Sequence, residues 1–382
     1  MITIQSKLPH VGTTIFTVMS QLATEHNAVN LGQGFPDFHC DPRLLDRLDA
    51  ATRAGHNQYP PMIGIASLRE AVAAKIESLY GYAYHPAQEV TITAGATQAI
   101  HTALTAIVHP GDEVIIIEPV YDSYEPVIRL NGGTPVYARL SAPDFRPDIA
   151  EIAALITPRT RAILINTPHN PTATTWSRAD LDQLAALLRN TNIIVISDEV
   201  YEHMVFDGVA HVSASSVAGL RERAFVVSSF GKTYHVTGWK IAYCVAPEAL
   251  MREFRKSHQF VVFTVHTPSQ HALADYMALR THEVLPAFYQ AKRDQFLAGV
   301  ADSKFQWQKP SSTYFALARF DGISGAPKGD ADFAMWLTRE HGVVCIPLSA
   351  FYHDKRDDGI VRFCFAKKSE TLTLGAARLS SL

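Results

Sequence analysis

Five polar side chains stand just past the ends of three short apolar runs, and together they offer a carboxylate, a phenol, an amide, a hydroxyl and an amine. They are Asp198, Tyr201, Asn170, Ser229 and Lys232. Open α/β sheets bind ligands beyond the carboxyl ends of their strands. We therefore expect these side chains to meet at one edge of a sheet and to form a site for acid, base and amine chemistry.

A fourth apolar run ends in Gly95, Ala96 and Thr97, where the pattern changes to that of a helix. The first turn of a helix leaves backbone N–H groups free and carries the positive end of the helix dipole, which favours an anion. Pyridoxal phosphate requires a partner for its ring nitrogen, donors for its ring oxygen, an amine that forms an imine and a binding site for its phosphate. The acid, the hydroxyl, the amide, the lysine and the anion site named above meet these needs. The sequence predicts this cofactor.

Other ligand motifs are incomplete. Gly231-Lys232-Thr233 resembles the end of a phosphate loop, but that loop requires glycine at position 226, which is Val226. Gly32-Gln33-Gly34 does not continue as a dinucleotide-binding turn. Histidine pairs at the spacing of a metal site are also lacking. We therefore predict neither a nucleotide site nor a metal site.

The elements that must position these residues alternate between strands and helices from about residue 60 to 250. Apolar runs near residues 90–93, 113–117, 162–165, 193–197 and 225–227 predict strands. They show no alternation of polar and apolar residues, which is typical of a mainly parallel sheet covered by helices on both faces. Capping boxes predict helices that begin near Ser67, with Glu70, and near Ser177, with Asp180. The fold class expected is α/β.

A second, smaller α+β domain is expected from the C-terminal part of the chain. Long helical patterns cover about 268–301 with a break near Pro286, and separated strands follow near 314–318, 343–346 and 360–365. This sheet is too small to stand alone, so we expect residues before about 45 to complete it. The predicted division is an N-terminal arm (1–12), a small domain (13–45 and 268–382) and a large cofactor-binding domain (46–267).

Composition limits the partners and the location. Apolar residues make up 47% of the 382 residues, charged residues 19%, and the formal net charge is −3. Such values are those of a folded protein and give no reason to expect a nucleic acid as partner. The longest apolar run has six residues, Ile241–Ala246, far below the roughly 18 of a membrane helix. Four unpatterned cysteines and the lack of an apolar leader in the first ten residues predict a cytoplasmic protein.

Seven segments, in order along nearly the whole chain, resemble those of the fold-type I, class I aminotransferases. They are NLGQGFPDF, NQYPP, TAGATQA, NTPHNPT, SDEVYEH, SSFGKTYHVTGWK and VRFCFA. Within the family the likeness is greatest to bacterial methionine aminotransferases and to kynurenine/glutamine aminotransferases. The resemblance implies a homodimer that transfers the amino group of a neutral apolar or aromatic amino acid, methionine foremost, to a 2-oxo acid. A C–S β-lyase on the same scaffold is the alternative.

The resemblance also assigns roles at the cofactor ring. Lys232 resembles the imine-forming lysine, which moves the proton between the substrate α carbon and the cofactor. Asp198 is similar to the acid that keeps the pyridine nitrogen protonated. Tyr201 and Asn170 resemble the donors to the ring oxygen, and Asn170 also contacts the substrate carboxylate. Tyr121 resembles the aromatic residue that stacks on the ring.

Further roles concern the phosphate and the substrate. By the same resemblance the phosphate is held by Gly95, Ala96, Thr97, Ser229, Lys240 and, across a dimer interface, Tyr59. Many relatives have arginine where this chain has Lys240, so a point charge replaces a two-pronged donor. Arg362 resembles the arginine that pairs with the substrate α-carboxylate. Gly34 would let the backbone approach that carboxylate, and the side-chain pocket is assigned to Phe16, Val265 and His266.

Overall fold

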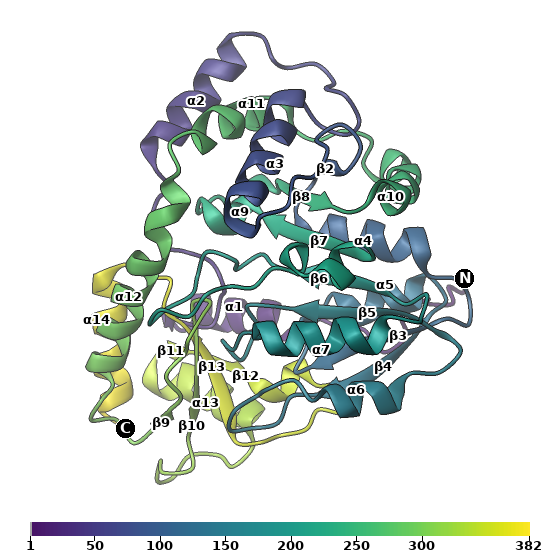
Figure 1. Ribbon diagram of the computed structural model, residues 1–382. Helices are drawn as coiled ribbons and strands as arrows, with labels where there is room; N and C mark the ends of the chain where they lie inside the picture. The colour runs from purple at the N-terminus through teal and green to yellow at the C-terminus, as the bar shows by residue number, and fades with distance from the viewer. Residues whose placement is uncertain (1) are drawn as a thin grey trace.

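A seven-stranded sheet forms the centre of the larger part of the molecule (Figure 1). The computed structural model describes residues 2–382. The strand order is β2-β8-β7-β6-β5-β3-β4, and neighbouring strands are parallel except where β8 pairs antiparallel with β2 and β7. The predicted α/β class with a mainly parallel sheet is confirmed. The strands are β2 (Val90–Thr93), β3 (Glu113–Glu118), β4 (Thr134–Arg139), β5 (Thr160–Asn166), β6 (Ile194–Asp198), β7 (Ala224–Ser229) and β8 (Ala242–Val245).

Helices cover both faces of this sheet. Successive strand residues point to opposite sides, so both faces carry apolar side chains that need cover. Ile116 and Leu164 join the apolar cluster on one face, whereas their neighbours Ile115 and Ile163 join the cluster on the other. Strands buried on both faces need apolar residues at every position, which is why the runs show no alternation. The first face is covered by α4 (Ala96–Ile107), α5 (Tyr124–Leu130) and α10 (Glu248–Val261), the second by α3 (Ala66–Tyr80), α6 (Ile149–Leu155), α7 (Arg178–Leu188) and α8 (Ala218–Arg221).

The two predicted capping boxes have different outcomes. At α7 the Ser177 hydroxyl accepts from the Asp180 N–H and the Asp180 carboxylate accepts from the Ser177 N–H, as predicted. At α3 the prediction is wrong: the helix begins at Ala66 and its N-cap is Ile65, which offers no side-chain hydrogen bond. The Ile65 N–H instead donates to the Gln270 side chain at 2.9 Å. A contact distant in sequence therefore replaces the local cap.

Two smaller sheets lie in the C-terminal part of the chain, and the N-terminal segment joins one of them. The four-stranded sheet has the order β12-β13-β10-β9 and the other pairs β1 with β11 in parallel. The N-terminal segment thus meets the C-terminal strands as expected, but in a separate two-stranded sheet. The strands are β1 (Val29–Asn30), β9 (Gln306–Trp307), β10 (Phe315–Arg319), β11 (Val343–Val344), β12 (Ile346–Pro347) and β13 (Ile360–Cys364).

The remaining elements are further helices and the 3-10 turns. The helical break expected near Pro286 lies just before this proline. Helix α11 (Thr267–Met277) is followed by a 3-10 turn, η3 (Thr281–Val284), and Pro286 lies in the first turn of the next helix, α12 (Leu285–Gly299). The other elements are α1 (Ile15–Glu25), α2 (Pro42–Arg53), α9 (Phe230–Thr233), α13 (Asp330–His341) and α14 (Ser369–Ser380), with 3-10 turns η1 (Ala214–Ser216), η2 (Thr237–Trp239) and η4 (Leu348–Phe351).

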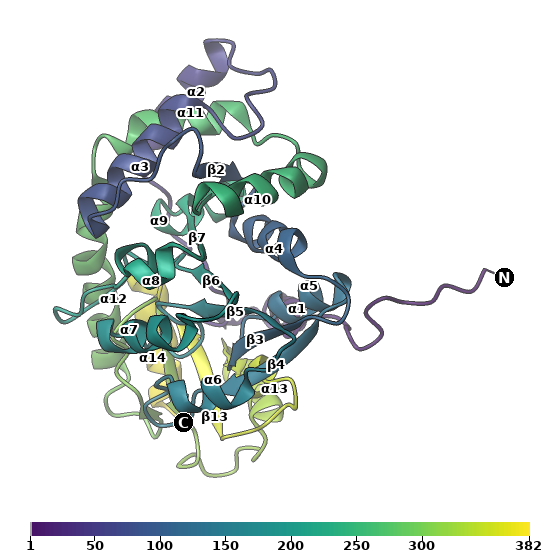
Figure 2. The ribbon, with the colours of Figure 1, turned by 45° about the vertical axis from the view of Figure 1, so that its right-hand side comes forward.

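The domain limits stay a prediction. Helix α2 crosses the predicted boundary at residue 45, and α11, assigned to the small domain, packs against α2 and against α3 of the large one. Residues 2–12 of the expected arm contain no helix or strand and extend from the body in Figure 2, while Met1 lies outside the described residues. Within residues 2–382, no helix is long and apolar enough to cross a membrane. All four cysteines are free, and Cys40 alone is not fully buried among them.

Candidate active site

A cavity of about 420 Å³ lies at the carboxyl ends of the central strands. All the predicted site residues line it except Tyr59, Val265 and His266. It is therefore walled by Phe16, Gly34, Gly95, Ala96, Thr97, Tyr121, Asn170, Asp198, Tyr201, Ser229, Lys232, Lys240 and Arg362. The expectation that polar residues at strand ends would converge is confirmed for this set.

Asp198 is the last residue of β6 and is 5% exposed. Its Oδ2 accepts a 2.5 Å hydrogen bond from the Tyr124 hydroxyl, and its Oδ1 accepts one of 3.3 Å from the Val200 N–H. Burial raises the pKa of Asp198 to about 6, although the Tyr124 hydroxyl, the Val200 N–H and the Lys232 ammonium favour the charged form. A cation placed at Oδ1 would lower this pKa again.

Lys232 lies in the short helix α9 that follows β7, and its amine faces neutral groups. The Nζ donates to the Tyr314 hydroxyl at 2.8 Å and to the Gly34 carbonyl at 3.1 Å. The Tyr314 hydroxyl donates to the same carbonyl at 2.6 Å. Removal of water around the amine lowers the pKa of Lys232 to about 8. A larger share of the side chain is then the neutral amine, the form that attacks a carbonyl.

Arg362 is buried in the middle of β13, with 1% of its surface exposed. Its guanidinium donates to Asn170 Oδ1 at 2.7 Å and to the Gly32 carbonyl at 3.0 Å, and it lies 4.0 Å from the centre of the Phe315 ring. Both hydrogen-bond partners are neutral, and Nε has no partner among residues 2–382. Burial lowers the pKa of Arg362 to about 10. A buried guanidinium with such partners is suited to a carboxylate ligand.

The predicted anion seat lies at the start of α4. Its N-cap, Gly95, has φ +84° and no side-chain hydrogen bond, so the first N–H groups of the helix face the cavity uncapped. A Cβ at Gly95 would lie 3.0 Å from Lys240 Cε and 3.1 Å from Lys240 Nζ. Glycine therefore lets the ammonium lie directly over the end of the helix. Ser229, the residue before α9, also lines the cavity.

Hydrogen bonds also connect Asn166, Asn170 and Asp198, which line the cavity. The Asn170 N–H donates to Asn166 Oδ1 at 2.8 Å, and Asn166 Nδ2 donates to the Asp198 carbonyl at 2.9 Å. The Tyr201 ring stands edge-on to Tyr314, with centroids 5.2 Å apart. These contacts hold the ends of β5 and β6 in one position relative to the small sheet.

The three exceptions lie together on another part of the surface. Tyr59, Val265 and His266 line a separate cavity of about 430 Å³. Tyr59 is 83% exposed, and its ring stands edge-on to the partly exposed Phe263 at 5.6 Å. Within one chain these residues are therefore not part of the cavity around Lys232.

The comparisons with known proteins identify the family. The family described as aminotransferase class I and II matches residues 26–379. The chain belongs to this family. It is 49% identical over 380 residues to the methionine aminotransferase of Escherichia coli (strain K12), covering 99% of this chain and 98% of the relative. It is 34% identical to the human kynurenine–oxoglutarate transaminase 1, covering 92% of each.

Solved structures support the same assignment. The crystal structure of an Escherichia coli protein reported to have methionine aminotransferase function is 48% identical and superposes with a TM-score of 0.96, covering 100% of both chains. The aminotransferase described here thus has the fold and the activity class that its motifs implied.

Several residues of the aminotransferase cavity were not predicted from the sequence. Tyr124, Asn166, Asp122 and Phe315 line it, and Tyr314 contacts Lys232 from the side of the small sheet. Asn166 opens the NTPHNPT segment, so its motif could have signalled it. A Cβ at Gly34 would lie 2.8 Å from the Phe315 ring, so close packing favours glycine here. The expected approach of its backbone to the substrate carboxylate stays a prediction.

Proposed function

We propose that this aminotransferase uses pyridoxal 5′-phosphate, held in the cavity around Lys232. The fit rests on the buried Asp198, on the uncapped start of α4 beneath Lys240, and on a lysine whose pKa is lowered to about 8. These groups match a ring nitrogen, a phosphate and an aldehyde. When bound, this cofactor supplies a protonated ring that accepts electrons from the bonds at the substrate α carbon.

The side chains around the ring would each do one task. Lys232 supplies its amine to the cofactor aldehyde and then takes and returns the proton at the substrate α carbon. Asp198 keeps the proton on the ring nitrogen through Oδ1. Tyr201 and Asn170 donate to the ring oxygen, and Tyr121 stacks on the ring.

The phosphate and the substrate would be held at opposite ends of the cavity. The N–H groups of Ala96 and Thr97 after Gly95, the Ser229 hydroxyl and the Lys240 ammonium bind the phosphate. Arg362 binds the α-carboxylate of the amino acid and of the 2-oxo acid. This arrangement points the substrate α carbon towards Lys232.

For the substrate we propose a neutral apolar or aromatic amino acid, with methionine favoured. The aromatic lining by Phe16, Tyr121 and Phe315 supports this choice, because a thioether gains from contacts with aromatic rings. The identity of 49% to the Escherichia coli methionine aminotransferase also supports it.

We further propose a homodimer with shared active sites. Tyr59 and Phe263 form an exposed aromatic pair, and Phe260 near it is 85% exposed. Exposed aromatic side chains grouped in this way are typical of an interface between chains. From there Tyr59 would reach the phosphate of the neighbouring subunit, and Val265 and His266 would complete that subunit's side-chain pocket. The four free cysteines support a reducing compartment, the cytoplasm.

The test is the fate of the amino group. Purified protein with pyridoxal phosphate, methionine and a 2-oxo acid should form the amino acid of that oxo acid in equal amount to the methionine consumed. A C–S β-lyase would instead convert an S-alkylcysteine to a thiol, ammonia and pyruvate without an added oxo acid. Ammonia release from an S-alkylcysteine without added oxo acid, at a rate above that of amino-group transfer, would reject the proposal in favour of the lyase.

A further inference from the structure

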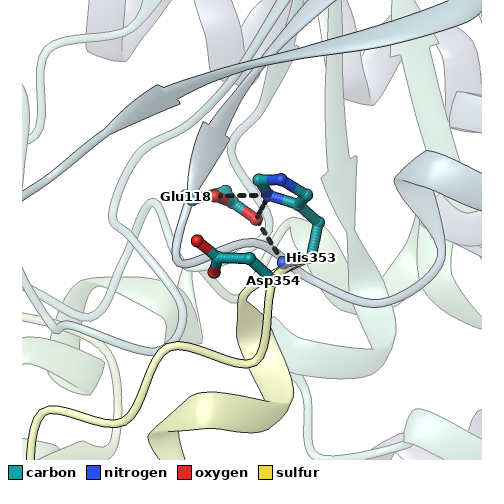
Figure 3. Close-up of side chains that lie close together, drawn as sticks. All are labelled: Glu118, His353 and Asp354. Carbon is teal, nitrogen blue, oxygen red and sulfur yellow. Dashed lines mark hydrogen bonds and ion pairs between the residues drawn. The ribbon is translucent and has the colours of Figure 1, made fainter.

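A second group of polar side chains lies outside the cavity and joins the end of β3 to the segment after η4. Figure 3 shows Glu118, the last residue of β3, pointing at His353, with Asp354 beside it. Glu118 Oε1 accepts a hydrogen bond of 2.6 Å from the backbone N–H of His353. Both carboxylate oxygens also lie 3.1 Å from Nδ1 of the His353 ring. Glu118 is completely buried. These contacts join residues 235 positions apart in the chain.

The three residues could hold a metal ion by their spacing, but an internal cation already serves them. The Arg139 guanidinium lies 3.7 Å from Glu118 and donates to Asp354. The His353 ring is stacked on Tyr137 at 3.8 Å, with the ring planes 8° apart. Arg139 thus bridges the two carboxylates. We call the contact between Glu118 and His353, which joins two distant segments of the chain, the clasp.

The clasp adjoins the proposed carboxylate site. Next to it, the Val120 N–H donates to the Phe351 carbonyl at 2.7 Å. Val120 precedes Tyr121 of the cavity wall, and the Arg362 guanidinium lies over the Phe351 ring, 5.0 Å from its centre. Phe351 also stands edge-on to Phe16 at 5.8 Å. The clasp and the Val120–Phe351 hydrogen bond thus both attach the segment that carries Phe351 to the end of β3.

We propose that Glu118 and His353 are positioning residues: their clasp holds Phe351 against Arg362 and so sets the geometry in which the arginine binds the substrate α-carboxylate. This rests on the proposed function, because it takes Arg362 as the carboxylate ligand. The clasp acts through Phe351 and touches neither substrate nor cofactor. Its loss should weaken carboxylate binding and leave the chemistry at Lys232 nearly unchanged.

The experiment measures binding of 3-phenylpropionate, a carboxylate without an amino group, to the holoenzyme by protein fluorescence, beside kcat and KM for methionine. His353→Ala should raise the Kd and the KM about fivefold and change kcat less than about twofold. His353→Gln, whose amide can still donate to Glu118, should recover most of the affinity. Asp207→Asn, which breaks an ion pair between two residues that do not line the cavity, Asp207 and Arg293, is the control for general loss of stability and should leave the Kd unchanged.

A double-mutant cycle separates this proposal from the proposed function. In an Arg362→Lys background, His353→Ala should change the Kd by less than about twofold, because the group that it positions is gone. An unchanged Kd in His353→Ala, or an equal rise in Asp207→Asn, would overturn the clasp and leave the role of Arg362 intact. Normal binding by Arg362→Lys would overturn both. If added Zn²⁺ lowered the Kd of the wild type for 3-phenylpropionate but not that of His353→Ala, the group of Glu118, His353 and Asp354 would be a metal site instead.

Discussion

The Tyr124 hydroxyl donates a 2.5 Å hydrogen bond to Oδ2 of Asp198, and both residues are buried and line the cavity. The other oxygen, Oδ1, accepts one longer bond of 3.3 Å from the Val200 N–H. Tyr124 therefore fixes the carboxylate in orientation and leaves Oδ1 the oxygen with capacity for a further donor. In the proposed function that donor is the protonated ring nitrogen of the cofactor.

The first prediction concerns the stability of the cofactor-free protein. Burial raises the pKa of Asp198 from 3.8 to about 6, so the folded state holds this proton more tightly than the unfolded chain. The protein therefore loses stability as pH rises from about 4 to about 6, by up to about 3 kcal/mol. Asp198→Asn should remove this loss.

Urea unfolding of the cofactor-free forms at several pH values measures the effect. The stability gain of Asp198→Asn over wild type should grow as pH rises to 7 and then level off. Asp207→Asn provides the opposite control, because ion pairing with Arg293 and Lys309 lowers the pKa of that carboxylate. A gain for Asp198→Asn that does not depend on pH would contradict the raised pKa.

The second prediction separates cofactor binding from catalysis. Lys232→Ala should abolish transamination, because the amine that moves the proton is lost, whereas pyridoxal phosphate should still bind through Asp198 and the start of α4. Turnover of methionine and cofactor retention after gel filtration are the two measurements. Lys256→Ala, an exposed lysine paired with Glu253, is the matched control and should be fully active. Near-normal turnover in Lys232→Ala would refute its role.

The residues at the strand ends were predictable because their positions depend on local sequence. Asp198, Asn170 and Lys232 each follow an apolar run directly, and parallel strands bring their carboxyl ends to one edge. Strand β8 was missed: its apolar residues were visible, but it returns antiparallel between β2 and β7, which the alternation of strands and helices does not indicate.

Other parts of the site depend on contacts that no local pattern signals. Tyr314 comes from the segment before β10 and meets Lys232 across 82 residues of sequence. Tyr124 reaches Asp198 from the start of α5, 74 residues away. A tyrosine in either place is equally consistent with an ordinary core residue. The role of Tyr314 depends on how the two sheets pack together, and that of Tyr124 on how α5 packs on the large sheet.

The third prediction concerns assembly. If Tyr59 serves the phosphate of the neighbouring subunit, each site needs two chains. Lys232→Ala homodimers and Tyr59→Ala homodimers should both have low activity, and mixing them should restore part of it, because one site of each heterodimer is intact. Subunit exchange is verified with a tag on one variant. If exchange occurs and activity stays low, the shared site is wrong.

The charges of the cavity bear on substrate choice. Its cationic side chains are Lys232, Lys240 and Arg362, and no further arginine or lysine lines it among residues 2–382. Each of the three has a role in the proposed function. Asp122 also lines the cavity, and its burial raises the pKa of this carboxyl group, while Arg362 lowers it. Burying the distal carboxylate of aspartate there without a cation costs several kcal/mol.

We therefore expect kcat/KM for methionine or phenylalanine to exceed that for aspartate by at least about tenfold, which corresponds to about 1.4 kcal/mol. Asp122→Asn should narrow this margin, because it removes the negative charge nearest to a distal carboxylate while keeping the size of the side chain. Steady-state kinetics of both proteins with the three amino acids and one 2-oxo acid measure the margin. A preference of wild type for aspartate would mean that an arginine from the partner subunit enters the cavity. If Asp122→Asn left the margin between methionine and aspartate unchanged, the missing cation, rather than Asp122, would be what excludes the acidic side chain.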